Sequence, residues 1–584
     1  MRELTSQKMR KIAPEQDPLR LGTGWKKDDL SKVQIMVEST YGDSHPGSVH
    51  LGKVSQDVRS GIASAGGFGA MYCCTDICDG ESQGTDGINY SLVSREMIAN
   101  MIEIHANATP FDGSVYIASC DKGLPAHLMA MARNNIPSIV VPGGVMNAGP
   151  GLLTLNELGV YNARFERGEI TCDELCFAKE NACPGCGACS FIGTASSMQI
   201  MAEALGLALP GSALLPAESD VFKDYSIRAG KRAVELALEG LCPSDIVNIK
   251  NFENAIIVHA AISGSTNCLL HLPAIAHEYG ICIDGDTFDR LHRNVPYLLN
   301  LRPAGKWPAE FFYYAGGVPA VMEEIRDLLH LDVMTVTGKN LGENLDDLKA
   351  NGFYDTCQKA LEDANAKYGI SISKEDIIRP RENPIGTDGS VSVLKGNLAP
   401  DGAVIKHTAC PGEMFYAVLN ARPFDSEEEC LNAVLRHEVQ KGDAVFIRYE
   451  GPRGSGMPEM FYTSEAISSD KELGRSIALI TDGRFSGAST GPVIGHVSPE
   501  AQSGGPIALV EEGDLIEIDI PNRRLNIVGV GGERKTPEEI QEILSIRKDA
   551  YVPPKPKYKA GVLRLFAEHA ASPMKGAYLE YSKK

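Results

Sequence analysis

The sequence lacks any long uninterrupted apolar run. Its longest apolar stretches, such as those at 256–262 and 476–480, fall far short of the roughly 18 residues that a membrane-spanning helix needs. Residues 1–17 also lack the apolar core that a secretory signal requires. We therefore expect a cytoplasmic protein with no membrane partner.

Basic residues are in short supply as well. The chain has 56 Lys and Arg against 76 Asp and Glu, which gives a formal net charge of −20. Nucleic acids and anionic membranes repel such a protein, so neither is expected as a partner. What is present is ordinary for a globular chain, with 43% hydrophobic and 23% charged residues over 584 positions. At about 150 residues per domain, that length predicts two to four domains.

Between about residues 29 and 369, short β-branched runs alternate with longer helical patterns. Residues 114–119 and 137–144 are typical of buried strands, whereas 95–108 and 195–209 are typical of helices. Strands that alternate with helices form a parallel sheet with helices on both faces. We predict an α/β fold with a doubly wound parallel sheet in the amino-terminal part.

The pattern changes after a polar connector rich in Pro and Gly at 373–390. Short alternating runs entered or left through Gly and charged residues then follow, at 442–451, 474–483 and 512–528. This pattern predicts a second, β-rich and barrel-like domain. We place the two domains at 1–378 and 379–584, and expect a loop and a short closing helix from about Pro553.

Three strand-like runs end in glycine-rich or polar loops, at 115–123, 139–147 and 256–267. Ligand sites in parallel sheets lie at the carboxyl ends of the strands. The first run delivers Cys120, Asp121 and Lys122 to that edge, with a helix expected from Leu124. A thiolate suits a soft metal and a carboxylate suits Mg²⁺, although a buried cysteine before a surface turn would look the same.

The chain has 15 cysteines, and several of them cluster. Cys183, Cys186 and Cys189 form a C-x₂-C-x₂-C pattern followed by a helical segment, which is a frequent arrangement around an iron–sulfur cluster. A zinc ribbon is the poorer alternative. Its second Cys pair would lie some 15 to 20 residues away, whereas Cys172 and Cys176 lie nearer than that. In a reducing compartment, such thiols are expected to be free rather than paired in disulfides.

Three further segments carry chemistry. Asp79 lies in an acidic, glycine-flanked loop and could contribute to an octahedral Mg²⁺ site. Glu459 follows a glycine-rich turn, and Ser486 lies in another. Ser486 is not in a G-x-S-x-G elbow, so as a base it would need a nearby cation to lower its pKa.

Six segments together resemble the family of dihydroxy-acid dehydratases and 6-phosphogluconate dehydratases. They occur in that family's order, from about Gly42 to about Val528. The matching segments are 78–92, 119–130, 183–198, 259–280, 449–460 and 481–501. Within the family, the middle of the chain is most similar to the sugar-acid branch of the D-xylonate type.

The resemblance implies roles for individual residues. Magnesium ligands would be Asp79, Asp121, Glu459 and Lys122, the lysine as a carbamate because an ammonium cannot bind a cation. Cys120 and Cys189 would hold the iron–sulfur cluster, and Ser486 would be the proton acceptor. We further assign three residues to the substrate, namely Ser265, Thr266 and Arg484.

One position departs from the family pattern. Relatives with a three-cysteine [2Fe–2S] site take one thiolate from a segment that here carries Gly47. The third ligand is therefore open, with Cys74, Cys78 and Cys186 as candidates. The cluster would be [2Fe–2S] or [4Fe–4S].

The activity that the resemblance implies is the dehydration of an aldonate such as D-xylonate to a 2-keto-3-deoxy acid, by an iron–sulfur and Mg²⁺-dependent hydro-lyase. The alternative is the dihydroxy-acid dehydratase of branched-chain amino-acid biosynthesis. A homodimer or homotetramer is expected. An electron-transfer or redox-sensing iron–sulfur protein would explain the cysteines but not the acidic loops or a large β-rich domain. A zinc-stabilised binding module would be colourless, whereas an iron–sulfur dehydratase should be brown.

Overall fold

The computed structural model describes residues 3–470, 472–486, 489 and 491–581. Its first sheet has four parallel strands in the order β2-β1-β3-β4. Strands β1 and β3 are buried along their whole length, as expected where helices cover both faces. The strands are β1 (Val33–Ser39), β2 (Gly67–Cys73), β3 (Gly113–Ala118) and β4 (Ser138–Pro142).

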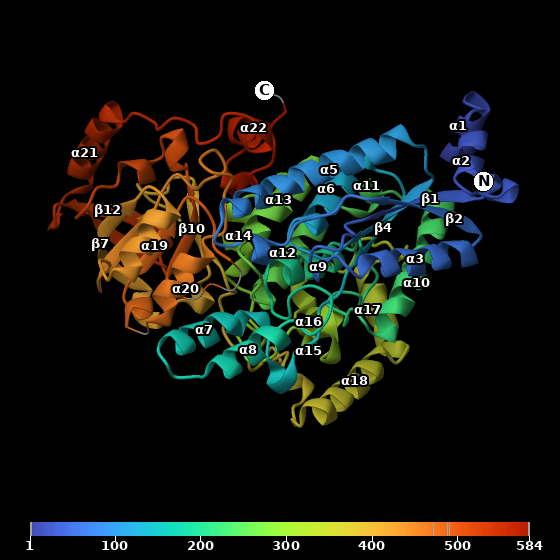
Figure 1. The fold of residues 1–584 in the computed structure, drawn as a ribbon, viewed down its shortest axis with the longest axis horizontal. Helices are drawn as coiled ribbons and strands as arrows, with labels where there is room; N and C mark the ends of the chain where they lie inside the picture. Colours follow the sequence, from blue (N-terminus) through green and yellow to red (C-terminus); the bar gives the residue numbers. More distant parts are fainter. Residues whose placement is uncertain (1–2, 471, 487–488, 490, 582–584) are drawn as a thin grey trace.

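Helices cover this sheet on both sides, which confirms the predicted doubly wound arrangement. In Figure 1, α5 and α6 lie on one side of the strands and α3 and α10 on the other. Glycine allows α3 and α10 to approach closely, because a Cβ at Gly61 would lie 2.0 Å from the carbonyl oxygen of Ile227. The helices are α3 (Leu51–Ser64), α5 (Tyr90–Ala108), α6 (Gly123–Asn134) and α10 (Asp220–Glu239).

The second sheet is a curled, mixed half-barrel of nine strands, which confirms the predicted β-rich, barrel-like part. Its order is β13-β12-β11-β7-β8-β9-β10-β6-β5, and the central strands β7 to β10 are parallel. The strands are β5 (Ser392–Leu394), β6 (Gly402–Ile405), β7 (Tyr416–Phe424), β8 (Asp443–Ile447), β9 (Ala478–Thr481), β10 (Val493–Ser498), β11 (Leu515–Asp519), β12 (Arg524–Val530) and β13 (Glu533–Arg534).

Alternating side chains of the second sheet enter two different cores. Ala444 and Phe446 of β8 face one apolar cluster, whereas Val445 and Ile447 face another. Helices α19 (Glu427–Leu435) and α20 (Phe461–Ser469) cover the second of these faces. Successive side chains of a strand thus point to opposite faces of the sheet and pack in different cores, as the alternating sequence pattern predicted.

One predicted strand is wrong. The apolar run at 256–262 belongs to helix α12 (Ile249–Ala261) and the turn after it, not to a strand. This helix is capped by Asn248, whose side chain accepts a hydrogen bond from the Lys250 amide. Because every residue from Asn254 to Ala261 is buried, this part of α12 has no exposed polar face, and periodicity cannot distinguish such a segment from a buried strand.

Other predicted helices are confirmed. Helix α6 begins directly after Lys122, α9 (Thr194–Ala204) follows the cysteine cluster, and α22 (Gly561–His569) lies in the tail. The amino-terminal core takes in Val393 and Val404 of the second sheet, so the two sheets are joined through apolar contacts. Within the described part of the chain, no helix has the length and apolar character needed to cross a membrane.

Candidate active site

Three carboxylates from distant parts of the chain meet in one buried place. Asp79 begins the short helix α4 (Asp79–Ser82), Asp121 follows strand β3, and Glu459 lies just before α20. One carboxylate oxygen from each lies within 4.8 Å of those of the other two. The structure thus brings together the three carboxylates that the sequence analysis assigned to Mg²⁺.

Two cations hold these carboxylates in place. Lys122 Nζ donates a hydrogen bond to Asp79 Oδ2 at 2.7 Å and lies 3.7 Å from Asp121 Oδ2. Arg484 forms an ion pair with Glu459 and donates to Ser91 Oγ at 2.9 Å. Lys122 and Arg484 are themselves buried, so their charges act on the carboxylates with little screening.

The pKa values of the carboxylates differ because their surroundings differ. Burial raises the pKa of Glu459 to about 7, despite the opposing charge of Arg484. Burial would also raise the pKa of Asp79, but Lys122 and Arg484 together hold it below its usual range. Buried carboxylates that repel one another are a fitting donor set for a hard divalent cation such as Mg²⁺.

A second site, made of thiols, adjoins the carboxylates. Burial raises the pKa of the Cys120 thiol, and the neighbouring charges of Asp76, Asp121, Cys78 and Cys189 raise it further. Burial likewise raises the pKa of Cys189, and the neighbouring charges of Cys78, Asp121 and Cys183 raise it further. Such charge effects act between nearby groups, so Cys78, Cys120 and Cys189 are neighbours, and we call the group that they form the thiol pocket.

The other candidate thiols have different neighbours. Apart from burial, the pKa of Cys186 is raised by Glu218, and that of Cys74 by Glu38, Asp76 and Cys73. Of the three candidates for a third ligand, Cys78 is the one whose charge raises the pKa of both Cys120 and Cys189.

Gly47 lies beside the thiol pocket. A Cβ at this position would lie 2.7 Å from Cys120 Sγ and 3.1 Å from Nδ1 of His45. His45 Nε2 and Asp76 Oδ1 are 3.1 Å apart, and among the described residues Nδ1 has no hydrogen-bond partner. Three thiols and an unpartnered imidazole nitrogen are donors that suit an iron–sulfur cluster.

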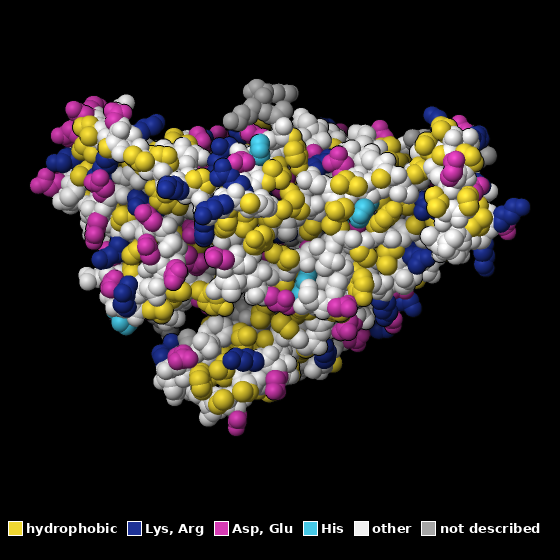
Figure 2. All heavy atoms as spheres, turned by 45° about the horizontal axis from the view of Figure 1, so that its top comes forward, with side chains coloured by type: hydrophobic (Ala, Val, Ile, Leu, Met, Phe, Trp, Pro, Cys, Tyr) yellow, Lys and Arg dark blue, Asp and Glu magenta, His cyan; other side chains and the backbone are white. Residues whose placement is uncertain are grey.

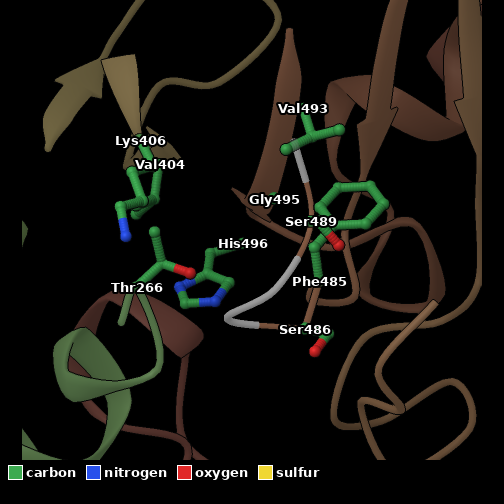
Figure 3. Close-up of a pocket in the computed structure, with 9 residues that line it drawn as sticks. All are labelled: Thr266, Val404, Lys406, Phe485, Ser486, Ser489, Val493, Gly495 and His496. Atoms are coloured by element: carbon green, nitrogen blue, oxygen red, sulfur yellow. The ribbon is translucent and has the colours of Figure 1, made fainter. Parts of the chain in front are cut away.

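Ser486 lines a pocket at the junction of three chain segments. Figure 3 shows Thr266 from the segment before α13 (Cys268–Glu278), Lys406 after β6, and Ser486 with His496 from the second sheet. Phe485, Val404 and Val493 supply apolar surface in the same pocket. Of the three residues assigned to the substrate, Thr266 is the one that lines this pocket.

Ser265 and Arg484 form hydrogen bonds or ion pairs with neighbouring side chains and do not line this pocket. Ser265 Oγ lies 3.1 Å from Thr194 Oγ1, and the amide of Ser265 donates to Ser197 Oγ. Arg484 pairs with Glu459, as described above. These two side chains support the walls of the site in this structure, rather than lining the pocket.

Sequence reasoning missed several residues of the site. Asn267 donates from Nδ2 to Glu459 Oε1 at 2.7 Å, and Ser91 bridges Asp79 to Arg484. Lys406 and His496 line the Ser486 pocket. Ser91, Asn267 and His496 lie within the six segments that resemble the family, and Lys406 lies outside them. None of the four has a distinctive spacing, so the sequence alone does not identify them as residues of the site.

Comparison with known proteins identifies the family to which the chain is similar. The family model for the dihydroxy-acid/6-phosphogluconate dehydratase amino-terminal part matches residues 32–344, and that for the carboxyl-terminal part matches 376–577. The chain is 42% identical over 560 residues to a dihydroxy-acid dehydratase of Solidesulfovibrio magneticus, covering 95% of each chain. It is 44% identical over 541 residues to dihydroxy-acid dehydratase 1 of Methanosarcina acetivorans, covering 91% of this chain and 92% of that protein.

Proposed function

Because the chain belongs to the dihydroxy-acid/6-phosphogluconate dehydratase family, and is thus a dehydratase, we propose that it removes water from a 2,3-dihydroxy acid of the branched-chain type. The relatives compared above carry the name dihydroxy-acid dehydratase. This favours the alternative in the sequence analysis over the sugar-acid activity that we expected first. The apolar side chains of Phe485, Val404 and Val493 in the Ser486 pocket also suit an alkyl substituent.

The observation that carries the proposal is the proximity of the two donor sets, which share Asp121 as a neighbour. Cys120 and Asp121 are consecutive, and Asp121 affects the pKa values of both Cys120 and Cys189. Asp121 also belongs to the carboxylate triad with Asp79 and Glu459. A small dihydroxy acid could therefore touch both sites at once, which an electron-transfer protein would not require.

Each donor set would hold one group. Asp79, Asp121 and Glu459 would hold Mg²⁺, which when bound supplies positive charge for a substrate carboxylate and its neighbouring hydroxyl. Cys78, Cys120 and Cys189 would hold an iron–sulfur cluster, which when bound supplies a Lewis acid for the hydroxyl that leaves. Lys122, 2.7 Å from Asp79, would add a further carboxylate as a carbamate.

The chain's own residues would perform the proton chemistry. Ser486 Oγ would take the proton from C2, and the electron pair of the C2–H bond would form the C2–C3 double bond as hydroxide leaves C3. The enol then becomes the 2-keto acid. Arg484 keeps Glu459 and Ser91 fixed, and the buried side chains around the pocket exclude water from the reacting atoms.

An anaerobic assay tests this function. Protein purified without oxygen should convert 2,3-dihydroxyisovalerate to a 2-keto acid, and a chelator of divalent cations should stop the reaction until Mg²⁺ is restored. Sugar acids such as D-xylonate remain the second candidate substrates, because segments in the middle of the chain resemble the sugar-acid branch. Failure to dehydrate any acid of either class would contradict the proposal.

A further inference from the structure

The imidazole of His496 is buried, and both of its nitrogens lack a partner in the described part of the chain. This side chain is 1% exposed, and among the described residues neither Nδ1 nor Nε2 has a hydrogen-bond partner. A buried polar group that lacks a partner destabilises the fold unless something else satisfies it. Two such nitrogens on one ring therefore point to a ligand or ordered water that occupies the space beside it.

The backbone is distorted at this residue. His496 has a φ of +57°, in the left-handed region that a residue with a side chain seldom adopts. The pairing of β10 with β6 shifts register between Gly495 and Ser498, which is the signature of a β-bulge. Bulges beside active sites change the direction in which a side chain points.

The distortion is held by hydrogen bonds on both sides. The amide of His496 donates to the carbonyl oxygen of Gly483 at 2.8 Å, and Ser498 Oγ donates to the carbonyl oxygen of His496 at 2.9 Å. The strand is therefore fixed in the form that directs the ring into the Ser486 pocket. Strain that is maintained in this way is often found at binding sites.

The pocket around the ring contains the base of the proposed reaction. Figure 3 shows the imidazole in the pocket that Ser486, Thr266 and Lys406 also line. The ammonium of Lys406 donates a hydrogen bond to the carbonyl oxygen of Ser263 at 2.8 Å, so it already has a partner. His496 is a wall residue whose two ring nitrogens both lack a hydrogen-bond partner among the described residues.

The chemistry of the ring indicates what it binds. Burial and the charge of Arg484 lower the pKa of His496 to about 3, so the ring is neutral near pH 7 and carries one N–H donor and one lone pair. A hydroxyl group can both donate and accept a hydrogen bond. A hydroxyl can therefore pair with either ring nitrogen, by accepting from the N–H or by donating to the lone pair, whereas a carboxylate could pair only with the N–H.

We propose that His496 binds the C2 hydroxyl of the dihydroxy-acid substrate and orients C2 toward Ser486. This inference rests on the proposed function, because Ser486 must reach the proton on C2. The hydroxyl on that same carbon is then the substrate hydroxyl nearest to the pocket wall. His496 is thus a substrate-binding residue that neither the motifs nor the family resemblance identified.

Binding of substrate fragments to variants of the anaerobically purified holoenzyme tests the inference. The probes are 2-hydroxyisovalerate, which has the C2 hydroxyl, and isovalerate, which has none. The variant His496→Phe should bind 2-hydroxyisovalerate about 5- to 10-fold more weakly than the wild type, in the range of one lost hydrogen bond. Its affinity for isovalerate should stay within about 2-fold, and His496→Gln, which keeps a donor and an acceptor, should recover part of the loss.

A matched control removes a different buried imidazole. His292 on α14 (Gly285–His292) is also fully buried and does not line the pocket, so His292→Phe should leave the affinities for both acids unchanged. Equal losses for both acids in His496→Phe, or no loss for either, would overturn the inference while leaving the proposed function intact. If wild-type protein bound neither acid, the proposed function would fail, and the inference would fail with it.

Discussion

A side chain at position 47 would collide with the thiol of Cys120, because a Cβ on Gly47 would lie 2.7 Å from Cys120 Sγ. Gly47 itself offers no thiol, although the family resemblance leads us to expect a cysteine ligand there. We propose that Cys78 supplies the third thiolate instead, because its charge raises the pKa of both Cys120 and Cys189.

The first prediction concerns these thiols. Replacing Cys78, Cys120 or Cys189 by Ser should remove most of the bound iron and the visible absorption of the cluster, because each change removes one thiolate ligand. Cys186→Ser is the matched control and should keep both. Iron content and absorbance are measured on anaerobically purified protein. A Cys78→Ser protein with full iron content would show that Cys78 is not a cluster ligand.

The second prediction concerns the metal carboxylates. Glu459→Gln should weaken Mg²⁺ binding, since it removes one charged ligand, and part of the lost activity should return as Mg²⁺ is raised. Glu450→Gln is a good control, because Glu450 is also buried and its pKa is also raised to about 7, with burial as the main cause. Titration of activity with Mg²⁺ distinguishes the two variants, and identical Mg²⁺ dependence in both would argue against a ligand role for Glu459.

The third prediction concerns the base. Ser486→Ala should lower kcat by about two or more powers of ten, the range expected for loss of a general base, while KM changes little because the metal and thiol sites remain. Ser489→Ala provides the control. Ser489 lines the same pocket, but its Oγ lies at hydrogen-bond distance, 2.9 Å, from Ser464 Oγ, and we assign it no role in the reaction. Near-normal kcat in Ser486→Ala would leave the serine as a turn residue.

The fourth prediction concerns Lys122. If this lysine carries a carbamate, protein equilibrated with ¹³C-labelled CO₂ should show a carbamate signal in its ¹³C NMR spectrum. The signal should be absent from Lys122→Arg, because a guanidinium does not form this adduct, and Mg²⁺ affinity should fall with it. An active wild-type protein without such a signal would show that Lys122 acts as an ammonium paired with Asp79.

Much of the fold could be predicted from the sequence, because the strands β3, β4, β8 and β9 have the period and the flanking turns of their class. Helix α12 could not, since a segment buried on nearly every side has no periodic signature. The triad of Asp79, Asp121 and Glu459 came from the family resemblance, and the structure shows that their carboxylates meet.

The sequence could not select a third cysteine ligand, because which cysteine approaches Cys120 and Cys189 depends on the paths of loops, which sequence spacing does not define. The same is true of His496, because its orientation depends on a bulge in β10. A bulge is a relation between two strands, so one strand's sequence does not reveal it. These are the features that required the structure.

The most direct test of the central claim is the ratio of kcat/KM for 2,3-dihydroxyisovalerate to that for D-xylonate, measured anaerobically with Mg²⁺ as formation of the 2-keto acid. A dehydratase of the branched-chain type should give a ratio well above one. A ratio well below one would assign the protein to the sugar-acid branch. If neither substrate gave a keto acid, that result would contradict the proposed dehydration itself.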